Sequence, residues 1–102
     1  MRVSHDQVAC AREVKLLDLL RILSAKELLD FRMDLDFVPV KDKETIRVLI
    51  ELASGLTYEL LITGQKWFDT RSQVGGGGAI DFYQHITNAS FIQAVNFLSL
   101  AR

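Results

Sequence analysis

Residues 63–82 read TGQKWFDTRSQVGGGGAIDF, which predicts a short strand, a polar turn, four consecutive glycines and the start of a helix. Ordering four glycines is unfavourable, because glycine loses more backbone freedom on folding than any other residue. The run therefore indicates positive φ angles, close backbone approach, or both, and we expect Gly77 and Gly78 not to tolerate a side chain. Glycine amides that open a helix also leave N–H donors where an anion binds favourably.

A lysine, a tryptophan and an arginine precede the glycines. This combination predicts a local site for phosphate or nucleic acid, in which a ring stacks on a base and cations contact phosphates. Trp67 and Phe68 adjoin on the predicted strand and so face opposite sides, which places one ring in the core and leaves the other to stack on a base. For Trp67 both roles, core residue and stacking platform, stay open. The glycine run has a steric alternative, a tight turn where a helix crosses close over the sheet. The predicted site comprises Lys66, Trp67, Arg71, Gly75, Gly76, Gly77 and Gly78.

The composition describes one ordinary domain of 102 residues with a net charge of −1, from 12 basic and 13 acidic side chains. Any nucleic-acid binding must therefore come from a local patch, and we expect it to be weak. Cys10 is the only cysteine, so no internal disulfide and no CxxC zinc pair can form, which is typical of a reducing compartment. The sequence shows no signal peptide and no membrane-spanning run, so the expected location is cytoplasmic.

The first third of the chain has helical periodicity that changes to strand periodicity. Ser4 and Gln7 form a capping-box pattern before one amphipathic helix that continues to residue 23. Ser24 and Glu27 repeat the pattern, which predicts a helical turn at 26–30. Apolar residues then alternate with charged ones from Phe31 to Phe37, as in a half-buried strand. Pro39 is expected at the end of that strand or on a sheet edge.

The middle and the end of the chain predict a hairpin sheet followed by two helices. Residues 45–52 fit both a helical face and strict alternation, and their β-branched content favours a strand. Residues 56–63 are its hairpin partner, and a turn at 64–65 leads into a strand at 66–69. Helices are expected over 79–87 and from Ser90 onward. The predicted fold is α+β, with a helical lead (1–30), three to four antiparallel strands (31–69), a glycine-rich loop (70–78) and two closing helices (79–102).

The order of Gln65–Asp69, the glycine run, Ala79–Phe82 and the Ser90–Leu98 helix resembles the zinc-finger-like module that precedes the Toprim domain of bacterial DNA primases. The likeness covers about residues 60–98 and includes primase-like proteins of plasmids and conjugative elements. It implies a zinc-ribbon-like core and a role in DNA replication or conjugation, in which the module binds single-stranded DNA template and presents it to a catalytic domain. That catalytic domain is not in these 102 residues.

The sequence departs from the family pattern at the metal site. Primases with a zinc ribbon carry cysteine pairs just before the glycines, where this chain has Asp69–Gln73 and no thiol. A degenerate, metal-free core is therefore expected, as in the plasmid-type relatives. A metal-free interaction module that docks onto a larger protein is the alternative, favoured by the leucine-rich first helix and the neutral charge.

Other chemistry has little support in the sequence. The glycine run lacks the lysine and hydroxyl residue of a P-loop, and no nucleophile and base are suitably spaced, so we expect no enzyme activity and no cofactor. Asp69 and Asp81 could pair on a metal, but closing the turn and favouring the helix N-terminus are the simpler roles. His5, Cys10 and His85 have no ligand spacing, so no metal site is predicted.

Overall fold

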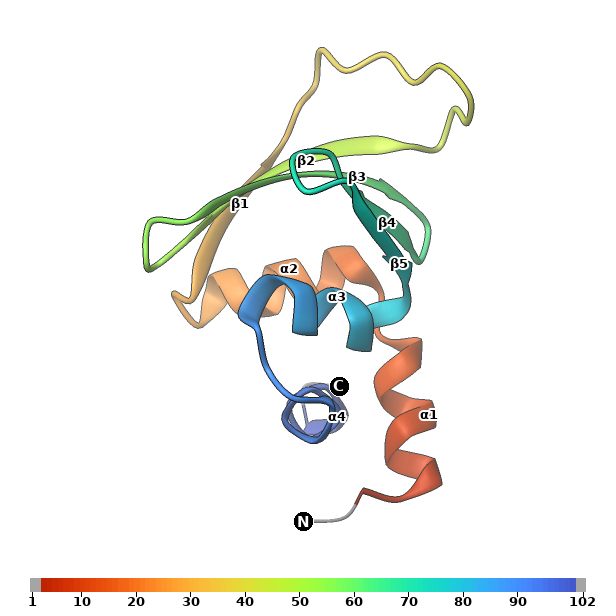
Figure 1. The fold of residues 1–102 in the computed structure, drawn as a ribbon, viewed down its shortest axis with the longest axis vertical. Helices are drawn as coiled ribbons and strands as arrows, with labels where there is room; N and C mark the ends of the chain where they lie inside the picture. Colours follow the sequence, from red (N-terminus) through yellow and green to blue (C-terminus); the bar gives the residue numbers. More distant parts are fainter. Residues whose placement is uncertain (1–2, 101–102) are drawn as a thin grey trace.

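The computed structural model describes residues 3–100 and confirms the α+β class with an antiparallel sheet (Figure 1). Two helices lead into five strands, and two helices follow. The elements are α1 (His5–Glu13), α2 (Leu16–Ala25), β1 (Leu29–Met33), β2 (Ile46–Leu52), β3 (Thr57–Thr63), β4 (Lys66–Asp69), β5 (Val74–Gly77), α3 (Gly78–Thr87) and α4 (Phe91–Leu100).

The strands form one antiparallel meander in the order β1-β2-β3-β4-β5. The sheet therefore has one strand more than the three to four predicted. The additional strand is β5, which contains three of the four glycines and pairs Gly76 with Trp67 and Gly75 with Phe68. Glycine is depleted in strands in general, so the sequence indicated a loop at 70–78, whereas here pairing with β4 extends the glycine backbone.

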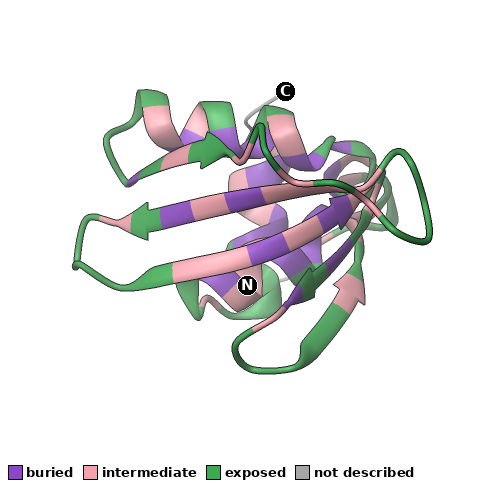
Figure 2. Cartoon of the chain, turned by 90° about the horizontal axis from the view of Figure 1, so that it is seen from above, coloured by how far each residue is buried: buried purple, intermediate pink, exposed green. Residues whose placement is uncertain are grey.

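In the part of the chain that the structure describes, helices cover one face of the sheet and none lies on the other. Figure 1 shows α2 and α3 across the concave face, with α4 beyond α3 and α1 beside them. Buried and less buried residues alternate along the strands (Figure 2), as the side-chain period of a strand requires. The core lies between the sheet and α2 and α3, where Leu19, Leu20, Val48, Leu60 and Phe82 are fully buried.

The predicted leading helix is two helices, because the chain breaks at Val14 and Lys15. Val14 has extended backbone angles and a buried side chain. The polar groups released by the break are bound by Gln65 from the β3–β4 turn: its Nε2 donates to the carbonyl of Val14 (2.9 Å), and its Oε1 accepts from the amide of Leu16 (3.3 Å). A side chain about 50 positions away thus stabilises the break, which helical periodicity could not reveal.

The predicted strand from Phe31 to Phe37 ends at Met33. Asp34 then forms a turn, in which its Oδ1 accepts from the amide of Asp36 at 3.0 Å. Its Oδ2 accepts from Arg47 of β2 at 2.9 Å. Residues 34–45 are consequently a loop, which contains Pro39 and rises on the uncovered side of the sheet (Figure 1). The alternating pattern continued past the strand because the loop itself contains apolar residues.

The remaining element predictions are mostly confirmed. Residues 46–52 are a strand and not a helix, and 57–63 form the hairpin partner. Reciprocal capping boxes open α1 at Ser4 and precede α4 at Ser90. The helical turn at 26–30 was wrong, since α2 ends at Ala25 and Glu27 takes a positive φ of 61° before β1 begins. None of the helices within residues 3–100 has both the length and the apolar composition of a membrane span.

Candidate nucleic-acid interface

The uncovered side of the sheet, here called the open face, carries the side chains that alternate with the core positions. They are Asp30 and Arg32 of β1, Arg47, Leu49 and Glu51 of β2, Thr57, Glu59, Leu61 and Thr63 of β3, and Lys66 and Phe68 of β4. This surface mixes cations, anions, hydroxyls and apolar groups over one sheet. No described helix lies on that side (Figure 1), so it is accessible to a ligand that follows the strands.

Trp67 and Phe68 face opposite sides, as predicted, and the tryptophan faces the helices. Trp67 is 5% exposed and packs edge-to-face on Phe82, with ring centroids 6.1 Å apart. Its ring therefore cannot stack on a base at the surface of this structure. Phe68 is 37% exposed and is the aromatic ring of β4 that lies on the open face.

The glycines differ sharply in what they require. A Cβ on Gly76 would lie 2.7 Å from Cζ2 of Trp67, so the indole occupies the space of that missing side chain. Gly78 has a positive φ of 84°, which other residues adopt at a strain. Gly77 is extended, and a Cβ there would meet only the Gln65 carbonyl at 3.9 Å. The expectation that Gly77 excludes a side chain was therefore wrong, because the space around it is free. The glycine without room for a Cβ is Gly76.

The N-terminus of α3 supplies only some of the free amide donors that the sequence predicted for binding a phosphate. Gly77 is the N-cap and contributes no side chain, while the amide of Gly78 donates to the Gln65 carbonyl at 2.7 Å and is thus occupied. The end of the helix opens on a hollow of about 330 Å³ that Arg12 and Asp81 also line. The carboxylate of Asp81 already interacts favourably with the helix dipole there, so this end competes poorly for an added anion.

Arg47 links two acidic side chains near the middle of the open face. Its guanidinium lies 2.9 Å from Asp34 Oδ2 and 2.8 Å from Glu59 Oε1. The hydrogen bond from Arg47 lowers the pKa of Glu59, despite partial burial that raises it, and the bond to Glu59 raises the pKa of Arg47. Because both of its neighbours are anionic, the charge of Arg47 is neutralised within the protein, and the side chain has little charge to offer a phosphate.

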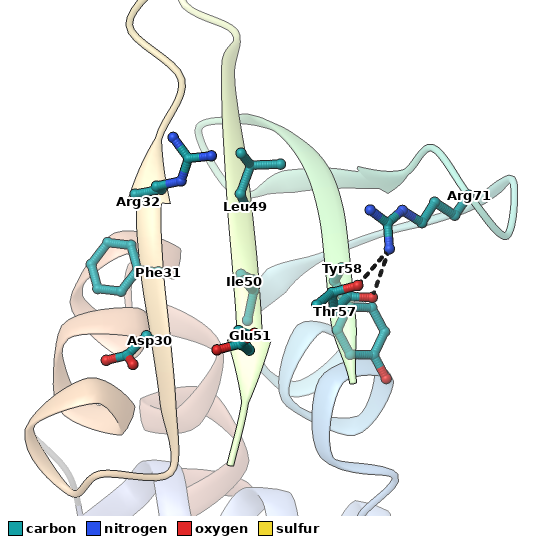
Figure 3. A pocket seen from close by; sticks show the side chains of 9 residues that line it. All are labelled: Asp30, Phe31, Arg32, Leu49, Ile50, Glu51, Thr57, Tyr58 and Arg71. Carbon is teal, nitrogen blue, oxygen red and sulfur yellow. Dashed lines mark hydrogen bonds between the residues drawn. The ribbon is translucent and has the colours of Figure 1, made fainter. Parts of the chain in front are cut away.

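Arg32 and Arg71 lie on either side of a shallow groove of about 410 Å³ on this side of the sheet (Figure 3). Arg32 projects from β1. Arg71 comes from the β4–β5 turn and donates from Nη1 to Oγ1 of Thr57 (2.6 Å) and to its carbonyl (3.3 Å). Leu49 lies between the two arginines, while Asp30 and Glu51 line the groove as well. The groove thus combines two cations, an aliphatic surface and two carboxylates.

The structure also contains a buried polar pair that the sequence did not indicate. Asp69 is 2% exposed, and its Oδ2 lies 2.7 Å from His85 Nε2, which carries the proton when the carboxylate is ionised. Its Oδ1 accepts from the amides of Arg71 (2.9 Å) and Ser72 (3.2 Å), which confirms that Asp69 closes the turn. Burial raises the pKa of Asp69, but the bonds from His85 and the two amides outweigh it, and the net pKa is lowered.

The Asp69–His85 pair joins β4 to α3 on the covered side of the sheet. The imidazole stacks obliquely on Trp67, with centroids 4.7 Å apart, and meets Tyr58 edge-on at 5.8 Å. In this position the pair fixes the turn and the helix to one another. Its sequence signal was only an aspartate and a histidine separated by 16 positions, which has no recognisable period.

Two of the seven residues predicted for the site lie at the open face. Lys66 belongs to β4, and Arg71 reaches this face with its side chain from the β4–β5 turn. Trp67 lies in the core, and the four glycines lie along β5 and the start of α3. Sequence reasoning did not select Arg32, Phe68 or Leu49. The change from helical to strand periodicity near Phe31 placed Arg32 on the polar side of a strand. This pattern was the sequence signal that could have identified Arg32 as a site residue.

Within residues 3–100, no group of three or more histidine, cysteine or acidic side chains is arranged to hold a metal ion. The segment Asp69–Gln73, in which the sequence lacks the cysteines of a zinc ribbon, forms the Asp69 turn just described. No protein-family model, curated protein or solved structure matches this chain.

Proposed function

We propose that this domain binds single-stranded nucleic acid along the open face, as an accessory module of a primase-like replication or conjugative-transfer protein. The observation that carries the proposal is the position of Phe68, an exposed ring on a sheet face that no described helix covers. Single-strand binding proteins combine such aromatic platforms with nearby cations, because every base has a face on which a ring can stack. The likeness to the primase module stays a prediction, and it points to the same ligand.

The cations assigned to the phosphates are Lys66 beside Phe68, Arg71 from the turn, and Arg32 on the far side of the groove. Arg47 is not assigned, because Asp34 and Glu59 already neutralise it. Trp67, which the sequence offered as a stacking platform, is replaced in this role by Phe68. The acidic residues Asp30 and Glu51 lie in the same groove, so the electrostatic attraction is modest and we expect low affinity.

The experiment is a fluorescence-anisotropy titration of labelled oligothymidylate at several salt concentrations. Replacing Arg32, Lys66 or Arg71 by alanine should weaken binding and flatten the salt dependence, by up to about 0.7 in log–log slope for each phosphate that is no longer neutralised. Arg21→Ala is the matched control, because Arg21 is an exposed arginine on α2, paired with Asp18 at 3.0 Å and remote from the open face.

The aromatic contact is tested separately. Phe68→Ala should weaken binding by roughly 5- to 150-fold with little change in salt slope, since stacking on a base is worth about 1–3 kcal/mol and releases few counterions. Phe91→Ala is the control, because Phe91 is similarly exposed at 43% but lies on α4 in the helical layer. Equal losses from Phe68→Ala and Phe91→Ala would contradict a site on the open face.

A second candidate function is a docking module for a larger protein. The loop at residues 34–45 exposes Leu35 (91%), Val38 (78%) and Val40 (95%), and exposed apolar side chains grouped on one segment are typical of interaction sites. This function replaces the first if the intact domain shows no salt-sensitive binding to single-stranded DNA or RNA at low ionic strength.

A further inference from the structure

A second hollow lies between the loop at residues 34–45 and the open face. It has a volume of about 500 Å³, which is within the range of small-molecule sites. Its apolar lining includes Phe37 and Pro39 of the loop, with Leu61 and Phe68 of the sheet. This space, here called the loop cleft, therefore has an aromatic ring in both of its walls.

The polar groups of the loop cleft suit a base attached to a phosphate. Thr45 and Thr63 both line it, and their hydroxyl oxygens are hydrogen-bonded at 2.6 Å. Since one proton serves that bond, the other hydroxyl proton and the remaining lone pairs can bond the edge of a ligand. Lys41 and Lys66 also line the cleft, against the single carboxylate of Asp42, so its charged groups sum to a net positive charge.

The ends of the loop are held by the protein, so the cleft is framed before any ligand arrives. At one end Arg47 binds Asp34, whose carboxylate also caps the amide of Asp36. At the other end Asp42 accepts from the amide of Glu44 through Oδ1 (2.9 Å) and from the amide of Thr45 through its carbonyl (3.1 Å). A preformed site loses less conformational entropy on binding than one that must be ordered.

We infer that the loop cleft holds one unpaired nucleobase, with its ring against Phe37 and Phe68 and its phosphate beside Lys66 and Lys41. This inference deepens the proposed single-strand binding and rests on it. The two aromatic walls and the net positive charge favour a base with its phosphate over an aliphatic side chain of a protein partner. In this arrangement the loop closes one base against the sheet while the strand continues across the open face.

The test compares oligothymidylate of eight nucleotides with a fully abasic strand of the same length. Wild-type protein should bind the thymidylate strand more tightly, and Phe37→Ala should reduce that affinity by roughly 5- to 150-fold while leaving the affinity for the abasic strand unchanged. Leu35→Ala is the matched control, because Leu35 belongs to the same loop but does not line the cleft. Thermal melting confirms that each variant is folded.

One outcome of this titration overturns the inference while the proposed function stands, namely Phe37→Ala binding thymidylate as tightly as wild type. Equal binding of the two strands by wild type overturns the inference together with the stacking role of Phe68, because an abasic strand has no base to stack. If wild type binds neither strand, the proposed function fails. NMR titration with thymidine 5′-monophosphate then tests whether the loop cleft binds a single nucleotide. Shifts confined to the amides of Phe37, Thr63 and Phe68 support it, and no shifts overturn it. Shifts caused by N-acetyl-leucinamide but not by the nucleotide also overturn it, because the occupant is then a protein side chain.

Discussion

The two faces of the sheet are built from the same strands and differ in nearly every other property. On the covered face, Val48, Ile50, Leu60 and Ile62 are buried against the helices. On the open face, the intervening residues are charged, hydroxylic or half-exposed. Burial of apolar area stabilises the fold in proportion to that area, so the covered face should dominate stability. The open face is left to interact with a ligand, and substitutions on the two faces should separate these roles.

The largest contrast is expected between neighbours on β3. Leu60 is fully buried and Leu61 lies half-buried on the open face. Leu60→Ala should lower the free energy of unfolding by about 2–5 kcal/mol, through lost transfer energy and the cavity left behind. Leu61→Ala should lower it by roughly 1 kcal/mol or less, because less area leaves water. Urea denaturation measures both, and equal losses would contradict the two-face division.

The next effect concerns the carboxylate on the covered side. Asp69→Ala leaves His85 and the amides of Arg71 and Ser72 without their acceptor, which should lower stability at pH 7 by about 2–3 kcal/mol. The folded-state pKa of Asp69 is lowered, so its contribution is fully present above the ordinary aspartate value of about 3.9 and is lost as pH falls through the folded-state pKa.

Melting curves at pH 7 and pH 3 check this prediction. Wild type should lose more stability than Asp69→Ala between the two values, because the variant lacks the group that binds a proton on unfolding at low pH. Parallel losses in the two proteins would show that other carboxylates account for the acid sensitivity.

The glycine strand gives a smaller and sharper contrast. Gly76→Ala places a Cβ 2.7 Å from the indole of Trp67 and should lower stability by roughly 1–2 kcal/mol, as overpacking does. Gly77→Ala meets nothing closer than 3.9 Å in an extended backbone and should change stability by about 0.5 kcal/mol or less. Thermal melting of the two variants measures this difference. If Gly77→Ala alone were destabilised, the space around Gly77 in β5 would be closed to a side chain, contrary to the structure.

The smallest effect is expected from the ion pairs of the open face. Arg47→Gln removes contacts to Asp34 and Glu59, both partly exposed, and should lower stability only slightly, with the difference reduced at high salt. Denaturation at low and high salt provides the measurement. A loss as large as that of Leu60→Ala would show that the open face is a second determinant of the fold.

Much of the fold could be predicted from local pattern, and the failures have a common cause. The hairpin sheet, the capping boxes at Ser4 and Ser90 and the opposite orientation of Trp67 and Phe68 follow from period and capping chemistry. The missed features depend on partners distant in sequence. Gln65 binds the backbone at the break between α1 and α2, and strand pairing converts the glycine run into β5.

The candidate site divides in the same way. The sequence indicated that a ring and cations gather near residues 66–71, but it could not decide which aromatic side chain is exposed. Side chains alternate between the two faces of a strand, and in Lys66-Trp67-Phe68-Asp69 either Trp67 or Phe68 could face the core. Packing against Phe82 of α3 places Trp67 in the core and leaves Phe68 on the open face. The loop cleft could not be predicted at all, since it forms where a loop approaches β3 and β4, which pair with each other and not with the loop.

The amino-acid sequence alone determined the class of fold, most of the helical and extended segments, and the absence of the cysteines that a zinc ribbon requires. These properties depend on residue type and on neighbours a few positions away. Only the tertiary structure decided which side of the sheet is open, which glycine cannot carry a side chain, and that Asp69 meets His85. Those properties depend on packing between segments far apart in the chain, where sterics and burial outweigh local preference.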